Sequence, residues 1–259
     1  SREAIEAFKR MTTRPASLAG RAYPDKENEL REFIDNILAL DGNPVTDKDP
    51  LAIIAPHIEI TAGEKLYARS YNTIRGKHYE RVIVLGVGHN MMDGVFSVGT
   101  KNYSTPLGEI AVDRLAAEHF RRKAENFLAP DELAHRKEHS IEFQTIFLQH
   151  VLEGDFSLLP ILVGSLHREL LGGDADNPGQ LDGMKEPLEY LRSLLDDSSC
   201  RTLLVAGMDF SHIGVKFGDR EPAIRIAHEA EKHDKNLLDS IEKIDSASFC
   251  KTSRDVRDQ

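Results

Sequence analysis

The chain of 259 residues is 40% hydrophobic, enough to bury a large core, and its formal net charge is −10. Its acidic surface argues against nucleic acid or an anionic membrane as a direct partner, because phosphate contacts need clustered Lys and Arg. The two cysteines, Cys200 and Cys250, form no disulfide framework. We see no secretory leader and no apolar run of membrane-spanning length, so we expect a cytoplasmic protein.

Strand-sized apolar runs alternate with amphipathic helical patterns along most of the chain. In chain order, the patterns predict helix 26–40, strand 51–56, helix 64–74, strand 81–88, a β-like stretch at 95–99, helix 113–124, helix 140–154, strand 156–164, helix 183–197, strand 201–207 and helix 223–243. The strands are apolar on both faces. This indicates an α/β architecture with a central, largely parallel sheet and helices on both faces.

Two further features concern the organisation of this architecture. No Ser/Gly-rich linker or internal repeat divides the chain, so we predict a single domain over residues 1–259. Pro160 lies inside the strand predicted at 156–164 and has no N–H to donate. It therefore predicts an edge position or a bulge for that strand.

Polar side chains follow three of the predicted strands. His57 follows the strand at 51–56, His89 follows the strand at 81–88, and Asp209 and His212 follow the strand at 201–207. Ligands of open α/β sheets bind beyond the carboxyl ends of the strands. The side chains could bind a divalent metal there with positions left open. They could also act without metal, one as a general base and another as an electrostatic clamp.

Any single histidine after a strand is more often an ordinary loop or core residue, although three such strand ends weaken that interpretation. His139 and Glu142 are three residues apart at the start of a predicted helix, so they share one face. We interpret Glu138 as an ordinary carboxylate at a helix start. The Gly-Val-Gly run before His89 is no dinucleotide fingerprint, because no third glycine follows it.

Seven motifs in one order resemble the Memo family, whose bacterial members are often named as component B of the AmmeMemoRadiSam system. They are AGRAYP (19–24), IIAPH (53–57), LGVGH (85–89), TPLGE (105–109), EHSIE (138–142), LPILVG (159–164) and DFSH (209–212). The resemblance covers about residues 15–250. The family is similar in fold to class III extradiol dioxygenases, which use non-haem iron(II) to open catechol rings.

The resemblance implies a role for individual residues. His57 and His89 match the two metal-binding histidines of the family. His212 matches the histidine that acts as acid and base in the dioxygenases, and Asp209 matches its acidic neighbour. The motif that contains His139 and Glu142 is implied to line the same pocket.

Two departures from the family pattern affect this site. Glu59 brings a carboxylate next to the pocket where the family has an Ala-Gly-Tyr run. The third ligand of the family is a cysteine in an Ile-Cys-Gly segment, which we expect after residue 259. Cys250 does not match that cysteine, and we interpret it as a buried structural thiol.

The implied cofactor is a divalent metal, with iron(II) ahead of copper and zinc, and a pocket without metal is the alternative. The functional prediction is a metal-binding, dioxygenase-like pocket in an oxidoreductase of small aromatic or related substrates. The alternative is a non-catalytic scaffold protein that keeps the ancestral pocket for a small molecule or a peptide. Function resides in the site rather than in the fold, so the resemblance does not name the reaction.

Overall fold

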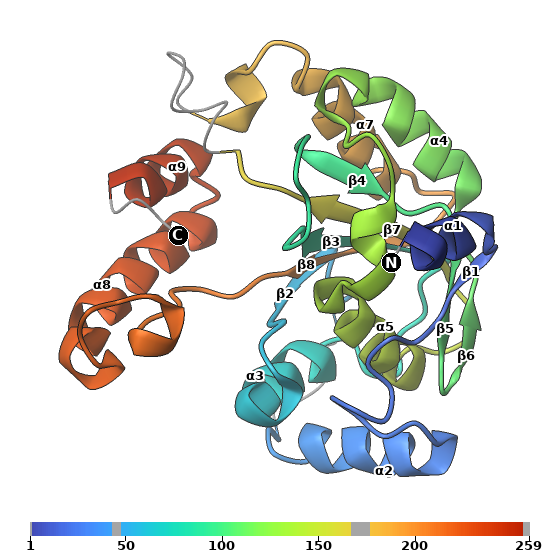
Figure 1. The fold of residues 1–259 in the computed structure, drawn as a ribbon, viewed down its shortest axis with the longest axis horizontal. Helices are drawn as coiled ribbons and strands as arrows, with labels where there is room; N and C mark the ends of the chain where they lie inside the picture. Colours follow the sequence, from blue (N-terminus) through green and yellow to red (C-terminus); the bar gives the residue numbers. More distant parts are fainter. Residues whose placement is uncertain (1, 43–47, 167–176, 256–259) are drawn as a thin grey trace. The chain divides into compact units, whose positions relative to one another are not determined.

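The computed structural model shown in Figure 1 describes residues 2–42, 48–166 and 177–255. The chain divides into two units. The first comprises Ser1–Ser165 and Glu186–Met208, and the second comprises Leu166–Lys185 and Asp209–Gln259. The single-domain organisation remains a prediction.

A five-stranded sheet forms the centre of the first unit, with the strand order β2-β8-β3-β7-β4. The four strands from β2 to β7 are parallel, and β4 is antiparallel to β7. Their bounds are Ala52–Ala55 for β2, Thr202–Gly207 for β8, Arg81–Val87 for β3, Ser157–Val163 for β7 and Phe96–Val98 for β4. Apolar side chains on both faces of β3 and β7 are buried, as parallel strands covered on both sides require. The predicted α/β class is confirmed.

Helices cover both faces of this sheet (Figure 1). On one face α5 contacts β3 and β8, while α3 contacts β2 and α2 packs on α3. On the other face α4 contacts β7, and His119 of α4 lies edge-on against Tyr190 of α7. The helix bounds are Glu27–Leu38 for α2, Ile60–Asn72 for α3, Arg114–Lys123 for α4, His139–Val151 for α5 and Lys185–Leu195 for α7. Each lies within a few residues of its predicted range, since amphipathic spacing is a local property.

Two glycines allow α5 to approach the sheet closely. A Cβ atom at Gly86 of β3 would lie 2.6 Å from both Ile141 Cγ1 and Ser140 Oγ, and one at Gly207 of β8 would lie 3.0 Å from the Ser140 carbonyl oxygen. A side chain at either position would therefore push the first turn of α5 away. The glycines place the start of α5 beside the carboxyl ends of β3 and β8.

The prediction that Pro160 marks an edge strand or a bulge was wrong. Its strand, β7, lies between β3 and β4, and Pro160 pairs in regular register with Val84. Its carbonyl oxygen accepts a hydrogen bond from the N–H of Gly99, the residue that follows the end of β4. In an extended strand the nitrogen and the carbonyl oxygen of one residue point to the same side, so the Pro160 nitrogen also faces this end of β4. The missing N–H therefore costs no bond between β7 and β3.

A second, three-stranded sheet has the order β1-β5-β6, and only β1 comes from the N-terminal segment. The sequence patterns did not predict this sheet. The bounds are Arg2–Arg10 for α1, Thr13–Arg14 for β1, Asn102–Thr105 for β5 and Gly108–Ile110 for β6, with short 3-10 helices at Glu125–Phe127 and Leu133–Lys137. Its strands are too short to show an alternating pattern in the sequence.

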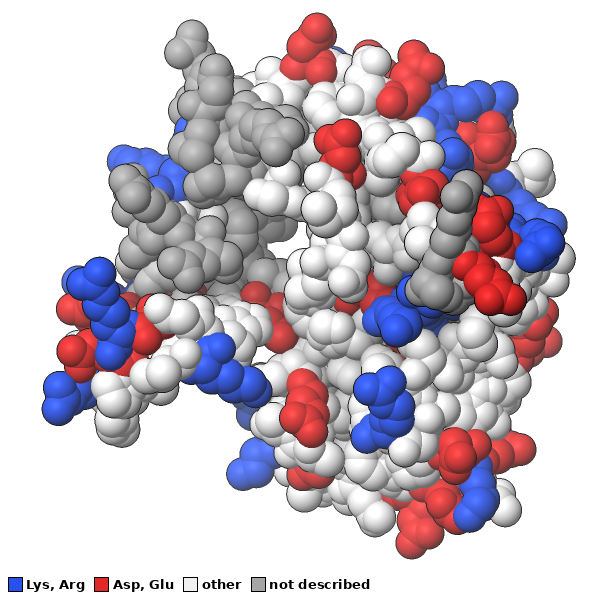
Figure 2. Space-filling view, in the orientation of Figure 1, with Lys and Arg blue, Asp and Glu red and all other residues white. Residues whose placement is uncertain are grey.

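The second unit contains the long helix α8 (Ala223–Glu242) and α9 (Ser246–Asp255), which pack on each other. It also has 3-10 helices at Pro178–Gln180 and Val215–Phe217. Figure 2 shows acidic and basic side chains interspersed on the visible face. In the part of the chain that the structure describes, no helix combines the length and apolar character needed to cross a bilayer.

Candidate metal centre

Three histidines from three segments meet at the carboxyl ends of the parallel strands. His57 follows β2, His89 follows β3, and His139 is the first residue of α5. The centroid of the His57 ring lies 5.1 Å from that of His89 and 5.4 Å from that of His139. The His89 and His139 rings stack with their centroids 4.7 Å apart. We call these residues the histidine cluster.

The ligand atoms of the histidine cluster are close enough to share one ion. One ligand atom from each residue lies within 4.8 Å of the other two. His57 is 3% exposed, whereas the side chains of His89 and His139 are 39% and 36% exposed. The cluster is therefore anchored in the protein on one side and accessible on the other, as a centre with open coordination positions requires.

The hydrogen bonds of the three rings select one tautomer. His57 Nδ1 lies 3.1 Å from the Gly207 carbonyl oxygen. The Nδ1 atoms of His89 and His139 lie 2.9 Å and 3.2 Å from the same oxygen, Glu138 Oε1. A carbonyl or an ionised carboxylate can only accept, so each Nδ1 carries the proton and each lone pair is on Nε2. Three neutral imidazoles of this kind suit zinc, copper, iron or nickel.

Glu138 has a second role as the N-cap of α5. Its side chain accepts hydrogen bonds from the backbone N–H groups of His139 and Ser140, and also from that of His89. Burial alone would raise the pKa of Glu138, but the hydrogen bonds from His139, His89 and Ser140 hold the pKa well below its ordinary value. The sequence interpretation of a helix-start carboxylate is correct for the backbone contacts, but it missed the contacts with the imidazoles.

Buried polar side chains of α5 tie its first turns to the strand ends. Ser140 Oγ donates to the Val87 carbonyl oxygen at 3.0 Å, at the end of β3. Gln144 Nε2 donates at 3.0 Å to the carbonyl oxygen of Pro56, the residue before His57. These bonds hold the segments that carry the three rings at fixed separations.

Glu142, expected to line the pocket, has its carboxylate in a buried network with the N-terminal segment. Its Oε2 lies 2.6 Å from Arg14 Nη2, and both side chains are almost completely buried. The carboxylate also accepts hydrogen bonds from Ser17 N and Oγ, Leu18 N and the Tyr23 hydroxyl. Burial, followed by the charge of Glu142, raises the pKa of Tyr23 well above its ordinary value. No pattern in the sequence pointed to Arg14.

Among the described residues, the ligand group of the cluster does not include the other predicted site residues. Glu59 is exposed at the N-cap of α3, where its side chain makes no capping bond. Asp209 and His212 belong to the second unit. There His212 Nδ1 lies 3.0 Å from the Phe210 carbonyl oxygen, and His212 Nε2 lies 3.9 Å from Asp209 Oδ2. The roles of these three residues remain predictions.

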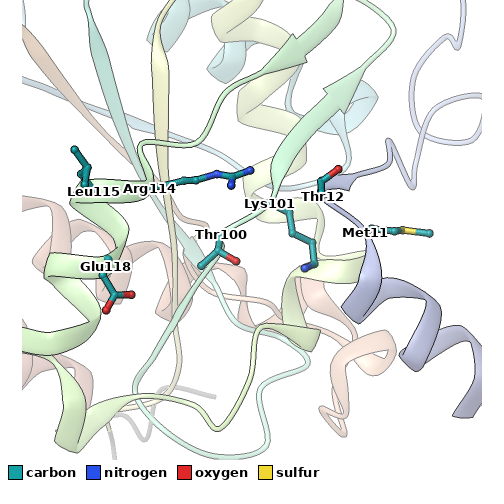
Figure 3. A pocket seen from close by; sticks show the side chains of 7 residues that line it. All are labelled: Met11, Thr12, Thr100, Lys101, Arg114, Leu115 and Glu118. Atoms are coloured by element: carbon teal, nitrogen blue, oxygen red, sulfur yellow. The ribbon is translucent and has the colours of Figure 1, made fainter.

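An open pocket of about 490 Å³ is lined by residues outside the cluster. Figure 3 shows that they come from the N-terminal segment, the turn before β5 and the start of α4: Met11, Thr12, Thr100, Lys101, Arg114, Leu115 and Glu118. Its buried cation, Lys101, is paired with Glu132 at 2.7 Å. Because that charge is used within the fold, the pocket offers weaker binding chemistry than the histidine cluster.

Comparison with known proteins now identifies the family. A family model described as Memo-like protein matches residues 14–258. The chain belongs to the Memo family. The sequence assignment is thereby confirmed, and the motifs ending in His57 and His89 contribute two of the three rings of the cluster in this Memo-family chain.

Several members of the family are similar over most of the chain. A MEMO1 family protein of Aquifex aeolicus is 32% identical over 206 residues, which cover 80% of this chain and 50% of that protein. A MEMO1 family protein of Methanosarcina mazei is 29% identical, covering 91% of this chain and 76% of that protein. The memo-1 homolog of Caenorhabditis elegans is 28% identical, covering 92% and 64%. The chain thus spans half the length of the first of these relatives.

Proposed function

We propose that this Memo-family chain is a metal-dependent oxidoreductase whose divalent ion is held by the Nε2 atoms of His57, His89 and His139. The observation that carries the proposal is the convergence of three imidazoles, each with its Nδ1 on a hydrogen-bond acceptor. A bound ion would supply Lewis-acid and redox chemistry at the open side of the cluster. His139 is the third ligand in this proposal, and the sequence had placed it in the pocket only through its motif.

Iron(II) is proposed first because the sequence resemblance implies a fold similar to that of non-haem iron dioxygenases, with zinc and copper next. Neutral imidazoles are borderline ligands that suit all three metals, so the ligand set itself does not favour one. Small aromatic molecules with neighbouring hydroxyl groups are the proposed substrates. Such molecules could fill coordination positions on the exposed side of His89 and His139.

His212 is proposed as the acid and base of the reaction. Its Nδ1–H donates to the Phe210 carbonyl oxygen, which leaves the lone pair on Nε2. A proton accepted at Nε2 would be on the side of Asp209 Oδ2, 3.9 Å away, and the carboxylate would orient the ring. The Asp209–His212 pair has the chemistry of a proton shuttle with its own counter-ion.

Metal content tests the ligand assignment. The chain, purified without chelator and then titrated anaerobically with iron(II), should bind one ion, and so should the control variant His119→Ala, whose imidazole is outside the cluster. The variants His57→Ala/His89→Ala and His139→Ala should each lose affinity by at least about 10-fold, because an open site with one or two imidazoles holds metal weakly. Equal metal content in all four proteins would refute the site.

Oxygen consumption with a panel of catechols tests the reaction class. The iron-loaded chain should turn over at least one of them. His212→Gln should bind iron normally but lose about 100-fold or more in rate, the contribution expected of a general acid and base. Full metal binding without turnover of any catechol would refute the oxidoreductase and favour the ligand-binding alternative.

A further inference from the structure

One buried carboxylate holds two of the three rings in the histidine cluster. Glu138 Oε1 accepts from His89 Nδ1 at 2.9 Å and lies 3.2 Å from His139 Nδ1. The same side chain accepts from three backbone N–H groups, and it is 1% exposed. Few water molecules can reach such a carboxylate, so the protein supplies almost all of its hydrogen bonds.

The backbone of Glu138 is held as firmly as its side chain. Arg14 Nη2 donates to the Glu138 carbonyl oxygen at 2.8 Å, and Arg14 Nε donates to the His135 carbonyl oxygen at 2.6 Å. Arg14 is 1% exposed and is itself fixed by Glu142. Glu138 is therefore held at its backbone carbonyl by Arg14 of the N-terminal segment, and at its carboxylate by the backbone N–H groups of the first turn of α5.

We infer that Glu138 is the positioning residue of the metal centre, fixing the tautomer and the orientation of His89 and His139 together. A ring that donates from Nδ1 to this carboxylate must present Nε2 on its opposite edge, and the negative charge makes that nitrogen a stronger ligand. Glu138 touches neither the metal nor a substrate in this arrangement and acts through the two imidazoles. The inference rests on the proposed metal-binding function.

Its chemical consequence is that one residue controls two ligands. A glutamine at position 138 has one acceptor oxygen and an NH2 group that can only donate. Both rings contact the same oxygen, Oε1, whereas Oε2 accepts from His89 N. If the amide oxygen takes the place of Oε1, both rings keep only a neutral, weaker acceptor and the NH2 group faces the His89 N–H; if the amide is reversed, both rings face a donor. Loss of an outer hydrogen bond of this kind typically lowers metal affinity about 10- to 100-fold.

Two measurements on three variants test the inference. The variants are Glu138→Gln, Glu138→Asp, and the control Glu132→Gln, which removes another carboxylate of low pKa whose partners are Thr100 and Lys101. Nitrogen-15 NMR of the metal-free chain at pH 8 identifies the tautomer of each imidazole, and calorimetric titration with zinc measures affinity. Circular dichroism checks that each variant is folded.

In wild type and Glu132→Gln, His89 and His139 should both be the Nδ1–H tautomer. In Glu138→Gln, whose amide is neutral in either orientation, the Nδ1–H tautomer of at least one of these rings should lose population, and zinc affinity should fall about 10- to 100-fold. Glu138→Asp keeps the charge but has a shorter side chain, so its zinc affinity should fall less than that of Glu138→Gln. It also keeps the inference testable if Glu138→Gln does not fold. Unchanged tautomers and affinity in both variants would overturn the inference.

The two readouts separate this inference from the proposed function. If wild type binds no zinc or iron(II), the metal-binding proposal fails, and the tautomers of the metal-free chain still decide whether Glu138 orients the rings. If wild type binds metal and the Glu138 variants bind it equally well with unchanged tautomers, only the inference fails.

Discussion

The most informative single change is Glu142→Gln, because the buried carboxylate of Glu142 joins the N-terminal segment to α5. Glu142 is 0% exposed and its ion-pair partner Arg14 is 1% exposed. The substitution keeps the shape of the side chain and removes only its charge and one acceptor oxygen. Any loss of stability therefore reports electrostatics and hydrogen bonding rather than a cavity.

The magnitude follows from the contacts. Removing one partner of a buried ion pair leaves the other charge uncompensated, which costs about 3–5 kcal/mol. In addition, Oε1 accepts from Leu18 N and the Tyr23 hydroxyl, while Oε2 accepts from Ser17 N and Oγ. Whichever oxygen becomes NH2, one backbone N–H, of Leu18 or of Ser17, faces a donor, whereas the hydroxyl on the same oxygen can turn to accept. These losses overlap with the charge effect, so we expect the free energy of unfolding to fall by about 3–5 kcal/mol.

Urea unfolding of the metal-free chain, followed by circular dichroism because the chain has no Trp, measures this loss. The control is Glu27→Gln, which breaks the exposed pair between Glu27 and Arg31. An exposed pair on a helix contributes only about 0.3–0.5 kcal/mol. A loss below about 1 kcal/mol for Glu142→Gln would refute the view that Arg14 depends on Glu142, since a buried pair would then behave like an exposed one.

Two further predictions concern pH and packing. Burial lowers the pKa of His135 from 6.5 to about 4. Between pH 6.5 and pH 4 the unfolded chain therefore binds more protons than the folded chain. The free energy of unfolding falls as the pH falls through this range, by up to about 3 kcal/mol. His135→Gln should lack this part of the pH dependence in urea unfolding, and an identical pH profile would contradict the assignment. Gly86→Ala should cost about 1–3 kcal/mol and weaken zinc binding, because its Cβ would displace the first turn of α5. In the control Gly42→Ala nothing lies within 4 Å of the added Cβ, so the stability and the zinc affinity should be unchanged. Equal stability of Gly86→Ala and Gly42→Ala would contradict the packing argument.

Much of the fold was predictable because the signals are local. The buried apolar run of β3 and the amphipathic spacing of α2 and α4 each specify an element without reference to the rest of the chain. The strand ends then identified His57 and His89 as neighbours of one sheet edge, and the structure places their rings 5.1 Å apart. These conclusions required only the period of the side chains and the rule that ligands bind at strand exits.

The sheet order was not predictable in this way. The strand β8 comes from residues 202–207 but lies between β2 and β3, which precede it by more than a hundred positions in the chain. Pairing between strands depends on the complementarity of distant apolar faces, and any of several orders would satisfy the same patterns. For the same reason Pro160 was assigned to an edge, although the neighbouring β4 ends just where its nitrogen points.

The sequence by itself therefore determined the strands of the central sheet and the helices that cover it, the α/β class, the family, and which histidines follow strands. Only the tertiary structure decided that His139 joins them and that Glu142, three residues further along α5, pairs instead with Arg14. The physical reason is that Gly86 and Gly207 let the start of α5 approach the strand ends, where Glu138 can reach two imidazoles. This close approach requires that β3 and β8 carry no side chain at positions 86 and 207. It brings together residues that no local pattern in the sequence connects.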